Sequence, residues 1–157
     1  MDTVKAVLKR LFAWGLAVLT TTGFAVIFQS QNIIARLNGL GGNIGLSDRL
    51  SVTFFDLTHL GSLYGIFISI ALAIAFLCGA LVYKIAKFGR PVIYICAGAI
   101  AMIVMLLMMK EVFFGVAIIA GARDMTGLAF QMVAGGLGGF VFSKISASKQ
   151  ARKNQMS

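Results

Sequence analysis

Residues 110–144 read KEVFFGVAIIAGARDMTGLAFQMVAGGLGGFVFSK, and this stretch decides the class of the fold. Two charged pairs, KE and RD, enclose an apolar loop, and an apolar run (residues 125–142) follows them. Glycines repeat along that run, so one face of the helix it predicts carries almost no side chain. In lipid, such a face is useful where a second helix backbone lies directly against it. The stretch therefore predicts a compact bundle of membrane-spanning helices.

The composition of the whole chain agrees with a membrane protein. The chain has 157 residues, of which 59% are hydrophobic and 12% charged, and its mean hydropathy is +0.94. A soluble domain averages about 25% charged residues. The net charge of +9 comes from basic residues that flank apolar runs, which indicates membrane topology signals and contacts with anionic lipid. We expect membrane lipid as a partner and no nucleic acid.

Four apolar runs approach the ~20 residues that cross about 30 Å of hydrocarbon. We predict an all-α, four-transmembrane-helix up-down bundle in one domain, residues 11–143, with spans at about 11–28, 60–83, 92–109 and 125–142. A cytoplasmic N-terminus, residues 1–10, precedes it, and a basic cytoplasmic tail, residues 144–157, follows it. The first run is longer than the core of a secretory signal, and no small-residue cleavage site follows, so we expect this helix to be retained.

The predicted outer connections are residues 29–59 and 110–124. Ile33, Ile34 and Leu37 follow a helical period, which predicts a short amphipathic segment on the membrane surface. Glycines then interrupt the helix, and Ser47 is placed to cap a new one that runs into the second span.

The basic residues are distributed unevenly about the four spans. Those on one side are Lys5, Lys9, Arg10, Lys84, Lys87, Arg90, Lys144, Lys149, Arg152 and Lys153. Those on the other side are Arg36, Arg49, Lys110 and Arg123. Cytoplasmic loops carry the excess of Lys and Arg. We therefore predict that both termini are cytoplasmic, in a bacterial inner membrane.

Small residues at a four-residue spacing predict helix-contact faces. The predicted contact residues are Gly61, Gly65, Ser69, Gly127, Gly135 and Gly139. A second row, in the first span, contains Ala13, Ala17, Thr21 and Ala25. These faces indicate packing within the chain, and the alternative is a dimerisation face or a substrate groove.

Polar residues gather at the outer ends of the predicted spans. The candidate binding residues of this outer mouth are Asp56, His59, Lys110, Glu111, Arg123, Asp124 and Gln131. The Gln131 amide lies within the fourth predicted span and must find an internal partner or a cavity, and we favour a structural hydrogen bond across helices over a ligand contact. Carboxylates beside an imidazole suit a proton relay or a cation site, whereas simple ion pairing is the structural interpretation that we favour. One histidine is too few for a transition-metal site, and Cys78 and Cys96 form no CxxC pair. We expect no metal, no other cofactor and no catalytic residue.

The sequence leaves three functions open. We favour a non-enzymatic accessory or assembly subunit that works through helix contacts with other membrane proteins. The alternative is a small homo-oligomeric transporter or channel, and a lipid-modifying membrane enzyme comes third. Transporters usually place ionisable groups at mid-membrane depth. Here every charge lies near the end of a predicted span, which favours the subunit.

Overall fold

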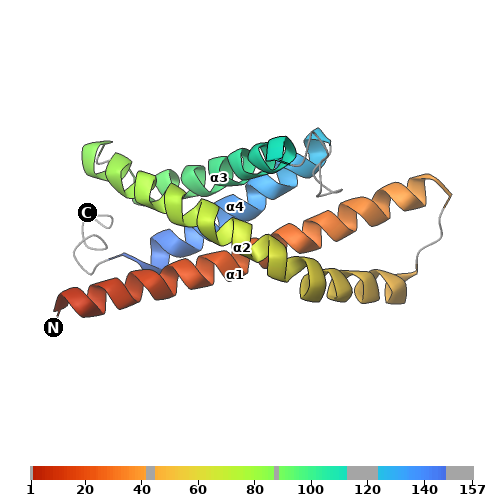
Figure 1. Ribbon diagram of the computed structural model, residues 1–157, viewed down its shortest axis with the longest axis horizontal. Helices are drawn as coiled ribbons and strands as arrows, with labels where there is room; N and C mark the ends of the chain where they lie inside the picture. Colours follow the sequence, from red (N-terminus) through yellow and green to blue (C-terminus); the bar gives the residue numbers. More distant parts are fainter. Residues whose placement is uncertain (1, 42–44, 87–88, 113–123, 148–157) are drawn as a thin grey trace.

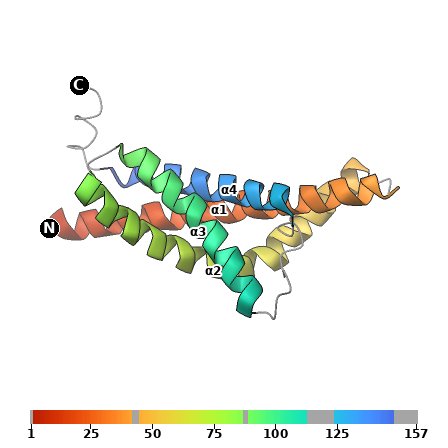
Figure 2. The same ribbon diagram turned by 90° about the horizontal axis from the view of Figure 1, so that it is seen from above.

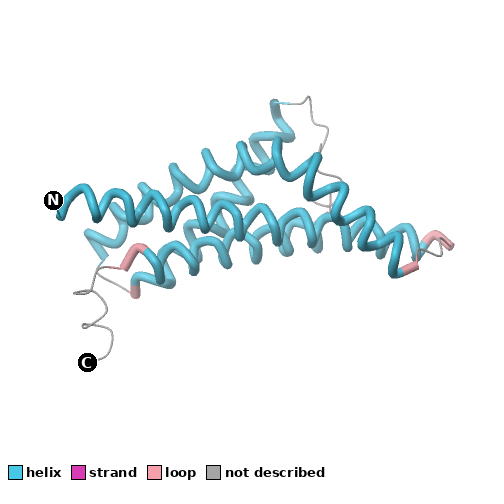
Figure 3. Tube along the Cα trace, turned by 90° about the horizontal axis from the view of Figure 1, so that it is seen from below, coloured by secondary structure: helices cyan, strands magenta, loops and turns pink. Residues whose placement is uncertain are grey.

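The computed structural model describes residues 2–41, 45–86, 89–112 and 124–147, and these residues form helices and short loops without a strand (Figure 3). The four helices of this described part are α1 (Asp2–Gly39), α2 (Leu46–Ala86), α3 (Arg90–Val112) and α4 (Met125–Ile145) (Figure 1). Each is long and apolar enough to cross a membrane. The prediction of an all-helical chain with four helices of membrane-spanning length is therefore confirmed.

The helix α1 continues well past the apolar run that predicted it. Residues 29–39 contain no proline and no glycine before Gly39, so nothing in the sequence ends the helix earlier. At its end, the Leu40 amide donates to the carbonyls of Arg36 and Leu37, each at 3.2 Å. Gly41 then takes a φ of +94°, which glycine adopts without a steric penalty. The segment expected as a separate amphipathic piece is therefore the continuation of α1.

The helix α2 begins at Leu46, where the Gly45 carbonyl accepts from the Arg49 amide at 3.1 Å. Asp48 lies in its first turn, where a negative charge is favourable. With 41 residues at about 1.5 Å each, α2 is about 62 Å long, and the 38 residues of α1 make about 57 Å. Both are about twice as long as the hydrocarbon layer is thick. The end of α1 and the start of α2 extend beyond the other two helices (Figure 1).

The helices α3 and α4 have 23 and 21 residues, close to the length of one membrane crossing. Before α3, the Gly89 carbonyl accepts from the amides of Val92 and Ile93 at 3.0 and 3.3 Å. Asp124 is the N-cap of α4, and its side chain accepts from the Gly127 amide at 3.3 Å. Such a cap satisfies one of the amides that a helix start leaves unpaired.

The four helices pack in a closed order, in which α1 contacts α2, α2 contacts α3, α3 contacts α4, and α4 returns to α1. Two hydrogen bonds tie one end of the bundle together. Lys9 Nζ donates to the Ala147 carbonyl at 2.6 Å, and Arg90 Nη2 donates to Ser146 Oγ at 2.8 Å. The starts of α1 and α3 therefore lie beside the end of α4 (Figure 2).

The helix α4 is held between α1 and α3 at backbone distance. The α1 row Ala13, Ala17, Thr21 and Ala25 is fully buried. A Cβ atom added at Gly138 would overlap Thr21 Oγ1 and lie 2.9 Å from the Ala17 carbonyl oxygen. The absence of a side chain at Gly138 therefore sets how closely α1 and α4 approach.

The contact between α3 and α4 is equally close. A Cβ atom at Gly135 would overlap the Gly98 carbonyl oxygen, and one at Gly98 would overlap the Gly135 carbonyl oxygen. One turn along, a Cβ atom at Gly139 would overlap the carbonyl oxygen of Tyr94. Close approach of this kind is how helices gain packing energy in lipid, where burial of apolar surface gives little.

The helix α2 packs differently, through large side chains. Its inward row is Tyr64, Ile68, Leu72 and Phe76, all nearly or fully buried. The Phe76 ring stacks on Phe142 of α4 with centroids 4.2 Å apart, and Tyr94 of α3 meets both rings at an edge. Outside this core, all four helices expose large apolar side chains, which suits a surface that faces lipid.

Candidate functional site

A band of hydrogen-bonding side chains crosses the bundle where α1 leaves it. We call this band the polar cluster, and its members are Ser30, Gln31, Asn32, Arg36, Thr53, Asp56 and Asp124. The first four come from α1, the next two from α2, and Asp124 caps α4. Of these residues, only the two acids were predicted as site residues from the sequence. The run QSQN, residues 29–32, directly after an apolar run was the signal for Ser30, Gln31 and Asn32.

Asp56 of α2 accepts a hydrogen bond from α1. Ser30 Oγ donates to Asp56 Oδ2 at 2.6 Å, and Ser30 is fully buried. Beside it, Gln31 Nε2 donates to Thr53 Oγ1 at 3.2 Å. A short hydrogen bond to a carboxylate is stronger than one between neutral groups. These bonds join α1 to α2 at the point where the two helices leave the bundle.

Asp124 is held by a different part of α1. Arg36 Nη2 lies 2.5 Å from Asp124 Oδ2, and Asn32 Nδ2 donates to Asp124 Oδ1 at 3.5 Å. The hydrogen bond from Arg36 lowers the pKa of Asp124, burial opposes this effect, and the Gly127 amide and the Arg36 charge add to the lowering. The side chains of Arg36 and Asp124 are 48% and 35% exposed. Ion pairs this exposed contribute little to stability, so we expect this pair mainly to orient α4.

The two acids do not form one carboxylate site. Ser30 and Asn32 are two residues apart, so their side chains leave α1 in directions about 200° apart. Ser30 holds Asp56 and Asn32 contacts Asp124, which places α1 between the two carboxylates. The sequence-based hypothesis grouped both acids in one outer mouth. In the structure they belong to two separate contacts of α1.

Three other residues of the predicted mouth face outward. His59 is exposed, and its ring stacks on Phe55 of the same helix with centroids 4.1 Å apart. The His59 Nδ1 atom lies 3.1 Å from the Phe55 carbonyl oxygen. Lys110 and Glu111 are exposed in the last turn of α3, and Arg123 lies outside the described residues. None of the contacts described for His59 reaches Asp56.

Gln131 lies deeper, and both the oxygen and the nitrogen of its amide are hydrogen-bonded inside the bundle. Its Oε1 accepts from the Tyr64 hydroxyl at 3.0 Å, and its Nε2 donates to the Ala25 carbonyl at 3.0 Å. Both side chains are nearly inaccessible, at 1% and 2% exposed. This network joins α1, α2 and α4 through one amide. It satisfies a polar group that would otherwise be unpaired in the apolar core.

The predicted helix-contact residues fall into two groups. Gly127, Gly135 and Gly139 of α4 are buried, and the last two lie against the α3 backbone. On α2, Gly61 is buried. A Cβ atom added at Gly65 would contact only the side chain of Thr22, at 3.6 Å. Ser69 is half-buried and its hydroxyl donates within α2 to Ile66, at 2.7 Å. The buried contacts of α2 are therefore made mainly by its row of large side chains, from Tyr64 to Phe76, and less by Gly65 and Ser69.

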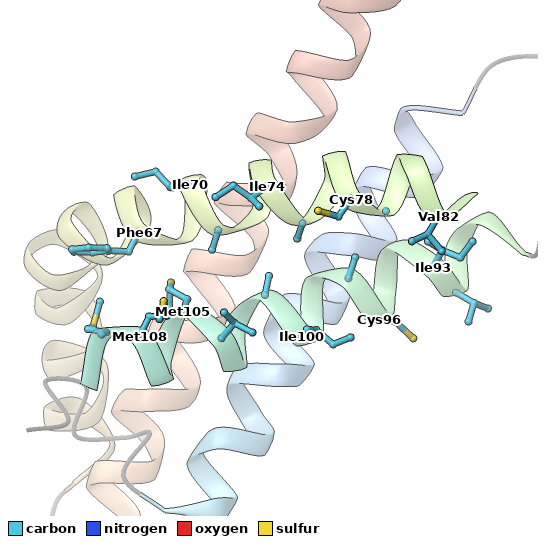
Figure 4. A pocket seen from close by; sticks show the side chains of 18 residues that line it. Phe67, Ile70, Ile74, Cys78, Val82, Ile93, Cys96, Ile100, Met105 and Met108 are labelled. Atoms are coloured by element: carbon cyan, nitrogen blue, oxygen red, sulfur yellow. The ribbon is translucent and has the colours of Figure 1, made fainter. Parts of the chain in front are cut away.

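An apolar groove runs between α2 and α3 and encloses about 820 Å³ (Figure 4). Every lining side chain is aliphatic, aromatic, a methionine or a cysteine. Phe67, Ile74, Cys78 and Val82 of α2 lie along one wall, and Ile93, Cys96, Ile100 and Met105 of α3 along the other. Both cysteines are free thiols. The groove therefore offers dispersion contacts and almost no hydrogen bonding.

Small residues form the deep part of this groove. On α2, Ala71, Ala75 and Gly79 repeat every fourth residue, and on α3 Ala97 and Ala101 do the same. A Cβ atom at Gly79 would lie 3.4 Å from the Tyr94 ring, so the two walls meet there. The four-residue spacing on α2 was the available signal for this groove, although the row predicted from the sequence, Gly61, Gly65 and Ser69, is a neighbouring one.

The described residues contain no group of three or more His, Cys, Asp or Glu side chains that could hold a metal ion. No family model, no curated protein and no solved structure matches this chain. The candidate sites therefore rest on the geometry of the chain itself, which offers a polar cluster, a buried amide network and an apolar groove.

Proposed function

We propose that this protein is a non-enzymatic accessory or assembly subunit of a membrane complex, and that the groove between α2 and α3 receives a transmembrane helix of another protein. The observation that carries the proposal is the pair of small-residue rows along the groove, on Ala71, Ala75 and Gly79 and on Ala97 and Ala101. Small residues let a third helix approach two others closely, and close approach is the main source of helix association in lipid.

The distribution of charge supports the same proposal. Among the described residues, the charged side chains lie near helix ends or in the extensions of α1 and α2. Gln131, which lies inside the bundle, has its amide oxygen and its amide nitrogen both hydrogen-bonded within the chain. An ion or proton pathway usually places ionisable groups at mid-membrane depth. The buried side chains there that have no described hydrogen-bond partner, Thr21 and Thr22, are neutral hydroxyls.

The proposed topology has four up-down crossings of a bacterial inner membrane, with both termini cytoplasmic. The excess of basic residues on one side supports it, as do the Lys9 and Arg90 contacts that gather chain ends at one end of the bundle. The extensions of α1 and α2 then reach the outer surface, where the exposed apolar residues Leu37, Leu50 and Phe54 would rest in the interface. Alkaline phosphatase and green fluorescent protein fusions at Lys87, at Gly41 and after Ser157 test this. An external carboxyl terminus would refute it.

A photo-crosslinking experiment in native membranes tests the groove. A benzophenone amino acid is introduced at Ile74 or Ile100, which line the groove and are 59% and 57% exposed. The matched controls are Leu63 and Leu107 on the same two helices, which are 61% and 54% exposed and lie outside the groove. We expect protein adducts from the two groove positions and only lipid adducts from the controls.

The mass of the adduct separates the possible functions. A heterologous adduct that recurs at both groove positions supports a subunit of a larger complex. An adduct of two copies of this chain would favour the homo-oligomeric alternative. Lipid adducts at all four positions would refute the groove as a protein-binding site. As a second readout, Ala75→Leu should abolish the adduct, because its side chain would fill the deep part of the groove.

A further inference from the structure

A second cavity lies at the opposite face of α2, at the end of the bundle where α3 begins and α4 ends. It encloses about 710 Å³ between α1, α2, α3 and the end of α4. Its walls combine apolar side chains such as Leu11, Phe76 and Leu77 with two arginines, Arg10 and Arg90. We call it the arginine pocket. No acidic side chain is among the described residues that line it.

Two residues that line the arginine pocket, Trp14 and Arg90, carry hydrogen-bond donors that the protein leaves unpaired. Trp14 Nε1 and Arg90 Nε are buried and have no partner among the described groups. The rest of the Arg90 side chain is fixed, because Nη2 donates to Ser146 Oγ at 2.8 Å and its guanidinium carbon lies 5.5 Å from the centre of the Tyr94 ring. An indole and a guanidinium can donate but not accept. A buried donor without an acceptor is unfavourable, so the site favours a ligand rich in acceptor oxygens.

The pocket also restricts the rest of the ligand. One part of its wall is apolar and includes Leu11 and Leu77. Both side chains are exposed, so this part of the wall is continuous with the lipid-facing surface. Free phosphate would satisfy the donors but leave this apolar part unfilled. A headgroup without negative charge would leave the two arginines uncompensated. An anionic headgroup with an attached acyl chain matches both parts.

We infer that the arginine pocket binds one molecule of an anionic glycerophospholipid, with its phosphate beside Arg10, Arg90 and Trp14 and an acyl chain along Leu11 and Leu77. This is a site of defined stoichiometry, distinct from general attraction of the basic end of the protein to a negatively charged membrane surface. It is independent of what the groove between α2 and α3 binds.

Trp14 makes the site directly observable, since it is the only tryptophan in the sequence. The full chain is reconstituted in phosphatidylcholine vesicles that contain phosphatidylglycerol or phosphatidylcholine with brominated acyl chains, at equal mole fractions. Bromine quenches indole fluorescence only at short range. We expect brominated phosphatidylglycerol to quench Trp14 more, with a binding preference of about fivefold for each arginine that contacts the phosphate.

Three variants test where this preference comes from. Arg10→Gln and Arg90→Gln should each lower it by about fivefold. Lys84→Gln removes the same charge near the same end of the bundle but outside the pocket lining, and it should leave the preference unchanged. Arg10 is exposed and makes no hydrogen bond or ion pair with another helix of the described part, so Arg10→Gln remains decisive if loss of the Arg90 contact to Ser146 disturbs the fold.

Three outcomes would overturn the inference. Equal quenching of the wild-type chain by the two brominated lipids would show that the pocket does not select an anionic headgroup. An equal loss of preference in Lys84→Gln and Arg10→Gln would assign the effect to general surface charge. Displacement of brominated phosphatidylglycerol by excess inorganic phosphate would show that the acyl chain is not part of the ligand.

Discussion

Replacement of Gly135 by alanine tests the closest contact in the bundle. A Cβ atom at this position would lie 2.8 Å from the Gly98 carbonyl carbon and 2.5 Å from Met102 Cγ, and it would overlap the Gly98 carbonyl oxygen. Carbon atoms in good contact are about 3.5–4.0 Å apart. The methionine side chain can rotate away, but the Gly98 backbone can move only with α3. The two helices must therefore separate by roughly 1 Å.

The loss of unfolding free energy depends on how many contacts between α3 and α4 this separation disturbs. Inserting one methyl group into a packed core typically destabilises a protein by about 1–3 kcal/mol. Here the separation would also loosen the neighbouring contact of Gly139 with Tyr94, because both pairs lie along the same two helices. We therefore expect Gly135→Ala to lower the free energy of unfolding by about 2–3 kcal/mol, at the upper end of that range.

Two glycines provide matched controls for the same chemical change. Gly136 is the next residue of α4, and a Cβ atom there would meet only Ile95 Cγ2, at 3.4 Å, and the Ile95 carbonyl oxygen, at 3.8 Å. Gly23 of α1 has no atom within 4 Å of its Cβ position. We expect Gly136→Ala to be nearly neutral. Gly23→Ala should be neutral or stabilising by up to about 1 kcal/mol, because alanine is the better helix former.

The assay is unfolding of the purified protein in mixed micelles, with the mole fraction of dodecyl sulfate increased and helix content followed by circular dichroism. The midpoint for Gly135→Ala should fall clearly below those of the two controls. If Gly135→Ala and Gly136→Ala unfold at the same mole fraction, α3 and α4 do not meet at backbone distance at Gly135.

Three further predictions use the same unfolding assay. Tyr64→Phe should destabilise the protein by about 1–2 kcal/mol, because it leaves the Gln131 Oε1 atom without a donor, and a neutral effect would show that the amide is bonded otherwise. Because Arg36 lowers the pKa of Asp124 in the folded protein, the stability from their contact should be present above about pH 4 and be lost as the pH falls through the lowered pKa. Arg36→Gln should remove that part of the acid response, and an unchanged response would refute the assignment. His59→Gln should change stability by less than about 0.5 kcal/mol, since the ring is exposed and its contacts with described residues all lie within its own helix; a larger loss would indicate a partner that we have not described.

Several features of the fold could be predicted from the sequence because they depend on the chain alone. The number of membrane-length helices follows from the length of the apolar runs, since a helix needs about 20 residues to cross the hydrocarbon. The buried row from Ala13 to Ala25 follows from its four-residue spacing. An internal partner for Gln131 was required because an amide cannot be left unpaired in an apolar core.

Other features depended on which helices meet, and the sequence could not specify this. In lipid the outward face of a helix is as apolar as the inward face, so hydrophobic periodicity does not identify the buried side. Nothing in the sequence of α3 distinguished Gly98 as the residue opposite Gly135. The same ambiguity explains why Gly65 and Ser69 were selected on α2, where the inward row consists of large side chains.

The polar cluster and the two cavities are properties of the tertiary structure. Asp56 and Asp124 are on the same predicted side of the membrane, and only the path of α1 between them separates their contacts. The extension of α1 to Gly39 brings Arg36 to Asp124, a pairing between residues far apart in the chain. The groove and the arginine pocket form where helices diverge, and divergence depends on the side chains of two helices at once. The sequence determined the helices and their chemistry, whereas packing alone decided which residues face each other.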